Sequence, residues 1–232
     1  MAISKVFELL SEDYPDVKTE LTYKNPYELL IAVILSAQCT DVRVNLTTPG
    51  LFRKYPTPQK LAAAKPADVE KLIHACGFYR AKTKSIMTAA RDIIERFGGE
   101  VPRTLDELVT LAGVGRKTAS VVLNQAFDEP AIAVDTHVKR VAHRLGWTKN
   151  TDPVKVEHDL RALLPKEQWS KVNGMLILHG RRVCKARNPK CEDCRVSAYC
   201  AYYATTEAKS LAAPELTSPA RSRRSPRPSS RK

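Results

Sequence analysis

The feature that most limits the fold is the spacing of apolar residues, which recur every three to four positions along nearly the whole chain. Such spacing places the apolar side chains on one face of a helix, whereas a half-buried strand shows strict alternation of apolar and polar residues. We find no convincing alternating run. Because the loops between the predicted helices are short, neighbouring helices must pack together, and the sequence predicts an all-α fold.

Capping signals mark where several helices begin. Asn25, Pro26 and Glu28 predict an N-cap, a first helical residue and a first-turn acid ahead of the apolar run LLIAVIL. Thr104 and Glu107 form a capping box at the start of a later helix. After the helix that opens at Asn25, the predicted helices cover residues 41–54, 66–75, 80–97, 104–111, 116–127, 136–145, 154–163 and 169–180.

A tight turn with two glycines separates two of these helices, in the stretch LAGVGRKTAS at residues 111–120. A Walker A loop needs a strand before it and Gly directly before its Lys, but here a helix precedes the turn and Arg116 precedes Lys117. Gly113 and Gly115 instead let the backbone turn sharply and let a partner approach the free N–H groups of the next helix. The turn is therefore either an ordinary helix connection or a seat for a phosphate group.

Lys117 falls in the first turn of that next helix. The helix dipole disfavours an ammonium ion there by about 0.3–1 kcal/mol, and the neutral amine is the form that a nucleophile needs. The same side chain could also act only as a charge beside a phosphate. The residues alone do not decide between these two roles.

A second polar centre is Asp135, which follows four apolar residues and precedes a predicted helix. This position is typical of an N-cap carboxylate. A carboxylate fixed in this way can also stabilise developing positive charge or assist a proton transfer, so the structural and catalytic roles are compatible. We expect the neighbouring His137 to pack on a helix face.

Four of the six cysteines lie within 17 residues, with the spacing C-x6-C-x2-C-x5-C. The chain begins with charged residues and lacks a secretory h-region, so we expect an intracellular protein whose clustered thiols bind metal. A structural zinc site and an iron–sulfur cluster both use four thiolates, and the spacing does not choose between them. Cys39 and Cys76 fit buried positions in helices. The candidate ligands are Cys184, Cys191, Cys194 and Cys200.

The net charge of +13 favours a polyanionic partner such as nucleic acid. Part of the excess lies in residues 207–232, a basic Ser/Pro/Arg tail that we expect to be disordered, but the rest of the chain is basic without it. No apolar run is long enough to span a membrane, so we expect no membrane association. Basic residues interleaved with the cysteines suggest a loop held against phosphates: Arg181, Arg182, Lys185, Arg187, Lys190 and Arg195.

The stretches LAGVGRKTA and IAVDTH, together with the cysteine spacing, resemble the endonuclease III family of bifunctional DNA glycosylases over residues 1–205. The resemblance implies a two-lobed helix-hairpin-helix fold. Residues 20–129 would form a six-helix barrel that contains the hairpin at 104–127. Residues 1–19 and 130–206 would form a second lobe, in which the four cysteines hold a [4Fe-4S] cluster, and this choice favours iron over zinc.

The resemblance also assigns chemical roles. By the family pattern, Lys117 is the nucleophile and Asp135 its catalytic partner. The implied substrate is duplex DNA with an oxidised pyrimidine or an abasic site, flipped out of the helix. The enzyme would release the base and cleave the strand 3′ to the abasic site by β-elimination from a Schiff base. We expect a monomer that acts in base excision repair at the nucleoid in the bacterial cytoplasm.

Further positions match DNA contacts of the family. Gln38 matches the residue that fills the gap left by the flipped nucleotide, and Phe78 stands at a wedge position that is often Leu. Ala112 stands where the family hairpin usually has Pro. The remaining expected DNA contacts are Gly113, Gly115, Arg116, Arg182, Lys185 and Arg187.

Two rival hypotheses remain at this point. An adenine-mismatch glycosylase of similar fold would lack the lysine at the hairpin, and Lys117 argues against it. A catalytically silent, metal-organised DNA-binding protein would keep the basic charge, the hairpin and the cysteines. Such a protein does not need Lys117 and Asp135 together.

Overall fold

The computed structural model describes residues 2–15 and 17–205 of the chain. Within these ranges the regular structure is helical and contains no strand, so the all-α prediction is confirmed. The prediction of a disordered tail at residues 207–232 falls outside the described residues.

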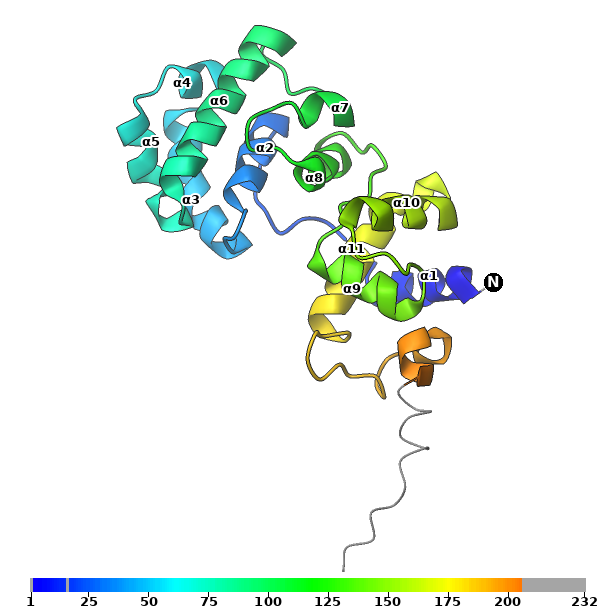
Figure 1. Cartoon of the computed structure of the whole chain (residues 1–232). Coiled ribbons are helices and arrows are strands. Elements are labelled where there is room, and N and C mark those ends of the chain that lie inside the picture. The colour runs from blue at the N-terminus through cyan, green and yellow to red at the C-terminus, as the bar shows by residue number, and fades with distance from the viewer. Residues whose placement is uncertain (1, 16, 206–232) are drawn as a thin grey trace, which may run out of the picture.

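The helices gather around two separate apolar cores, which makes the molecule two-lobed (Figure 1). The first core takes its side chains from residues 21–131. The second core joins residues 6–14 to residues 132–196, so segments from both ends of the chain share one lobe. The first lobe contains α2 (Pro26–Leu35), α3 (Asp41–Lys54), α4 (Pro58–Ala62), α5 (Pro66–Ile73), the 3-10 helix η1 (His74–Cys76), α6 (Tyr79–Phe97), α7 (Leu105–Leu108) and α8 (Arg116–Ala126). The second contains α1 (Ala2–Asp13), α9 (Thr136–Leu145), α10 (Pro153–Leu163), the 3-10 helix η2 (Lys166–Gln168), α11 (Trp169–Arg182) and the 3-10 helix η3 (Ser197–Tyr199).

Helix α2 lies at the centre of the first lobe and is buried along its length from Tyr27 to Leu35. It packs against α3, α6 and α8, which explains why its sequence is apolar on every face. As predicted, Asn25 caps it, because the Asn25 Oδ1 accepts a hydrogen bond from the Glu28 N–H at 2.9 Å. The buried carboxyl end of α2 leads into the exposed turn that carries Gln38.

Most predicted helices are confirmed within two residues of their ends, and α3 and α9 match at both ends. The helix predicted at 104–111 is shorter, because after Leu108 the backbone closes tighter i to i+3 bonds. Two helices were not predicted. The mixed sequence of α1 becomes helical because Val6 and Leu10 pack into the second core, and the five residues of α4 are too few to show a periodicity.

A hydrogen-bonded ion pair joins the two lobes. The guanidinium group of Arg116, at the start of α8, donates to Glu157 of α10 from Nε at 2.6 Å and from Nη2 at 3.0 Å. Glu157 is only 3% exposed and also forms an ion pair with Arg161, whose Nη2 lies 2.6 Å from its carboxylate. The bond to Glu157 raises the pKa of Arg116 further. The residue before Lys117 is thus fixed to the opposite lobe.

We expect Glu157→Gln to lower the free energy of unfolding by about 2 kcal/mol, measured by chemical denaturation. The loss should be smaller than the roughly 3–5 kcal/mol of a fully buried pair, because both arginine side chains keep some solvent contact. The matched control is Asp68→Asn, which removes the exposed Lys54–Asp68 pair and should cost less than about 1 kcal/mol. Equal losses in the two variants would contradict a structural role for the Arg116–Glu157 pair.

Candidate functional site

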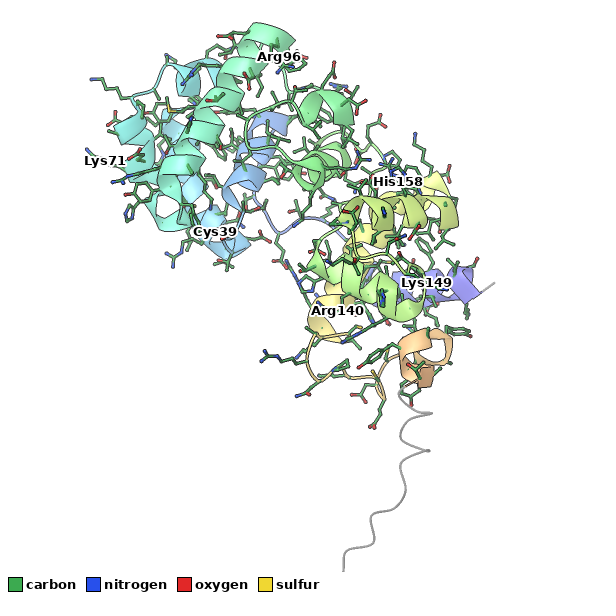
Figure 2. The ribbon with its side chains drawn as sticks, viewed as in Figure 1. Cys39, Lys71, Arg96, Arg140, Lys149 and His158 are labelled. Atoms are coloured by element: carbon green, nitrogen blue, oxygen red, sulfur yellow. The ribbon has the colours of Figure 1, made fainter. Side chains whose placement is uncertain are left out.

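A pocket of about 290 Å³ lies between the two lobes and takes its walls from both. This is near the lower end of the roughly 300–1000 Å³ typical of ligand pockets. Its lining includes residues 17–21, Ser36 and Cys39. Figure 2 labels Cys39 at the lower edge of the first lobe. The pocket also contains Lys117 of α8 and Asp135. The structure therefore brings together the two residues that the sequence singled out in separate stretches.

Asp135 caps α9, as predicted. Its Oδ1 accepts hydrogen bonds from the backbone N–H groups of His137 and Val138, both at 2.8 Å. The buried segment 131–134 leads to it and is held in turn, because the Ala133 N–H donates to the Asn173 side chain. The cap uses one carboxylate oxygen, so Oδ2 can take part in other chemistry while the group stays fixed in place.

Lys117 is exposed, so its amine is open to a reaction partner. Its charge reaches two neighbours across the pocket. Burial raises the pKa of Asp41, while the Arg181 and Lys117 charges oppose that rise. Burial also lowers the pKa of His137, and nearby cations, among them Lys117, lower it further. The negative charge of Asp135 acts in the opposite direction. The Lys117 charge therefore acts both on Asp41 of α3 and on His137 in the first turn of α9.

No sequence pattern indicated that Asp41 or Arg181 would line this pocket. The Arg181 guanidinium lies 3.5 Å from the Glu20 carboxylate and 4.0 Å from that of Asp41, and all three side chains line the pocket. Asp41 follows the N-cap Thr40, so in the sequence it is an ordinary first-turn acid. Its place in the pocket follows only from how the lobes meet.

The two glycines of the hairpin differ in their geometry. Gly113 has φ +78°, and a Cβ atom there would lie 2.8 Å from the Ser85 Cβ atom on α6. Gly115 is extended, with φ −89°, and has open space around it, so of the two glycines only Gly113 has a left-handed backbone. Gly115 supplies no side-chain cap to α8, which leaves the first N–H groups of this helix available to a partner.

Gln38 and Phe78 are both exposed and both held in the left-handed backbone region, with φ +54° and +45°. This conformation is uncommon for residues other than glycine and gathers at binding sites, where the surrounding structure maintains it. Phe78 is 68% exposed, which is unusual for a large aromatic residue. Both positions that the family resemblance marked for DNA insertion thus show backbone strain, which no sequence pattern signalled.

The four clustered thiols line one largely apolar cavity. Among the described residues, no three His, Cys, Asp or Glu side chains are grouped so that they could hold a single metal ion. Four thiolates around one cavity are the donor set that an iron–sulfur cluster uses.

Arginines of α9 hold the start of the cysteine loop. Arg144 donates to the Cys184 Sγ at 3.3 Å and to the Lys185 carbonyl at 2.7 Å. Arg140, labelled in Figure 2, donates to the Cys184 carbonyl at 3.1 Å and to the Gly180 carbonyl at 2.9 Å. The helix that begins beside Asp135 thus also supports the cysteine cavity.

The basic residues around the cysteines do not share one role. Arg182, Lys185 and Arg187 are exposed, as a DNA-facing loop requires. Arg195 differs, because it forms 2.7 Å ion pairs with Glu12 and Asp13 and so joins the loop to α1. The Arg195 charge is therefore shared with two acids of the same lobe.

Comparison with known families matches residues 31–166 to the HhH-GPD superfamily of base excision DNA repair proteins, and residues 184–200 to the iron–sulfur binding domain of endonuclease III. The chain is 48% identical over 198 residues to endonuclease III of Synechocystis sp., which covers 85% of this chain and 90% of the relative. This chain belongs to the endonuclease III family. Endonuclease III of Bacillus subtilis is also 48% identical, over 82% of this chain and 88% of its own.

Solved structures of the family agree. A non-covalent endonuclease III–DNA complex matches with a TM-score of 0.83 at 43% identity, over 89% of this chain and 97% of that one. A trapped endonuclease III–DNA covalent intermediate also matches with a TM-score of 0.83, at 44% identity, over 88% and 97%. The predicted two-lobed helix-hairpin-helix fold and the assignment as a bifunctional DNA glycosylase and lyase are confirmed at the level of the family.

The expected [4Fe-4S] cofactor is confirmed by the match to the iron–sulfur domain, and the zinc alternative is dropped. When bound, the cluster would cross-link the loop of residues 184–200 internally, because all four clustered thiols belong to that loop. Over the described part of the chain, none of the helices combines the length and apolar character needed to cross a membrane.

The contrast between the two glycines gives a stability prediction. Gly113→Ala should lower the free energy of unfolding by about 1–3 kcal/mol, since it forces a Cβ into a left-handed turn pressed against Ser85. Gly115→Ala, two residues away in open space, should change it by less than about 0.5 kcal/mol. Chemical denaturation of both variants checks this. A larger loss for Gly115→Ala would show that the turn is held differently.

Proposed function

We propose that this chain removes oxidised pyrimidines from duplex DNA and then cleaves the strand 3′ to the resulting abasic site. In this proposal Lys117 is the nucleophile and Asp135 its catalytic partner. The observation that carries it is their shared pocket between the lobes, which combines an exposed amine with a carboxylate that is fixed through only one of its oxygens.

The solved relatives support DNA as the partner. Endonuclease III has been captured with DNA both without and with a covalent bond, and a covalent complex requires a protein nucleophile. We extend this to duplex DNA with oxidised pyrimidines or abasic sites, bound by a monomer. The bacterial relatives support a cytoplasmic, nucleoid-associated location.

The proposed chemistry starts at the sugar. The Lys117 nitrogen forms a bond to C1′, and the bond from C1′ to the damaged base breaks, with its electron pair leaving on the base. The Lys117 nitrogen must lose a proton, and the Asp135 carboxylate is held in the same pocket to assist. Opening of the sugar ring then gives a Schiff base. Loss of a proton from C2′ expels the 3′ phosphate and breaks the strand.

The DNA contacts follow from the surfaces around the pocket. The uncapped start of α8 offers N–H groups to a phosphate, and the open space at Gly115 allows the close approach that this needs. Gln38 and Phe78 would enter the duplex, and the exposed cationic side chains near the cysteines would contact its backbone: Arg182, Lys185 and Arg187. The guanidinium of Arg116 is directed to Glu157, so only its backbone N–H is offered to DNA.

A second lysine makes the nucleophile assignment testable, because Lys18 lines the same pocket and is also exposed. Borohydride reduction on a duplex with an oxidised pyrimidine should trap wild type covalently. Lys117→Gln should reduce the trapped fraction by at least about a hundredfold, since the proposal makes its amine the one that attacks the sugar. Lys18→Gln is the matched control and should trap as wild type does.

Loss of trapping in Lys18→Gln with retention in Lys117→Gln would reverse the assignment. Absence of any adduct with wild type would contradict the lyase proposal itself.

We also propose that the four clustered thiolates are the cluster ligands. Purified protein should contain about four iron atoms per chain, measured by metal analysis, and should absorb visible light as iron–sulfur proteins do. Cys194→Ser should lower the iron content well below wild type, because the cavity loses one of its four thiolates. Cys39→Ser, outside the cavity, should keep it. Full iron content in Cys194→Ser would remove that residue from the ligand set.

A further inference from the structure

Lys82 of α6 is a buried cation that the proposed chemistry does not use. It is 6% exposed, and its Nζ donates to two backbone carbonyls, of Leu35 at 2.9 Å and of Cys76 at 2.8 Å. These two carbonyls belong to the last residue of α2 and the last residue of η1. One side chain thus connects the ends of two helical segments that lie 41 residues apart in the sequence.

The pairing has a clear physical basis. Carbonyl groups in the last turn of a helix lack partners within the helix and carry partial negative charge. A buried ammonium group is costly unless it is hydrogen-bonded, so Lys82 and the two carbonyls satisfy one another. An apolar side chain at position 82 would leave both carbonyls without this donor.

The two helix ends lead directly into the strained turns. Gln38 follows Leu35 by three residues, and Phe78 follows Cys76 by two. Both residues have positive φ and are exposed, whereas the Lys82 contact beneath them is buried. The two turns also meet at their thiols: burial raises the pKa of Cys76, and a side-chain hydrogen bond with Cys39 adds to that rise. The starting points of both turns are therefore set by one buried group.

We propose that Lys82 is a positioning residue that fixes the spacing between Gln38 and Phe78, so that both enter the duplex at one damaged nucleotide. This inference rests on the DNA-insertion roles proposed above for those two residues. Strained turns need surrounding structure to hold them, and the Lys82 contacts provide a shared anchor. Without that anchor each turn could relax independently. Gln38 and Phe78 would then no longer enter the duplex at the same nucleotide.

A double-mutant cycle tests the proposal. We expect Lys82→Met and Phe78→Ala each to lower kcat/KM on a lesion-containing duplex about tenfold. The double variant should lose little more than either single change, because a residue that acts through Phe78 has no further effect once Phe78 is gone. Fluorescence of 2-aminopurine placed opposite the lesion should show reduced unstacking in all three variants. Lys84→Met, on the exposed face of α6, is the matched control and should behave as wild type.

The outcomes separate the two ideas. Independent losses that multiply to about a hundredfold, with normal unstacking in Lys82→Met, would overturn the positioning role and leave the proposed role of Phe78 intact. Unchanged activity in Phe78→Ala would overturn both. If circular dichroism and iron content show that Lys82→Met does not fold, Lys82→Gln keeps a donor for one carbonyl and replaces it in the same cycle, with the same expected non-additivity.

Discussion

The ion pair between Arg116 and Glu157 is the contact on which the geometry of the pocket depends. Lys117 is carried by α8 of the first lobe and Asp135 by the start of α9 in the second, so their separation is set by how the lobes meet. The pair fixes the first residue of α8 to a nearly buried carboxylate of α10 through two parallel hydrogen bonds, a geometry that restrains direction as well as distance. The adjacent Lys117 lines the same pocket as the Asp135 carboxylate of the other lobe, and within the described part of the chain it forms no ion pair of its own.

Most of the functional features lie at helix ends, and the free backbone groups of each end are satisfied in a different way. Asp135 satisfies the start of α9 with one oxygen and keeps the other for chemistry. The start of α8 has no side-chain cap, which suits a seat for a phosphate group. The end of α2 is satisfied from outside by Lys82. The three helix ends thus differ in how their free backbone groups are satisfied.

Local sequence patterns predicted much of the fold and part of the candidate site. Apolar spacing and capping residues located most helices, because they depend on neighbours within a few positions, and Asp135 was identifiable as a cap for the same reason. The family resemblance supplied the cluster and the catalytic pair. Glu157, Lys82 and Asp41 could not be found in this way, since their partners lie 41, 47 and 140 residues away or are backbone atoms. Arg116 was assigned to DNA because a basic residue beside a glycine turn gives no sign of a buried partner in another lobe.

The central claim is that the amine of Lys117 forms the covalent bond to the sugar. The most direct measurement is peptide mapping by mass spectrometry of the reduced protein–DNA adduct after nuclease and protease digestion. The account predicts that the mass of the sugar remnant is found on the peptide containing Lys117, and that Lys18, which shares the pocket, is unmodified. A remnant on Lys18 or on any other residue would contradict it.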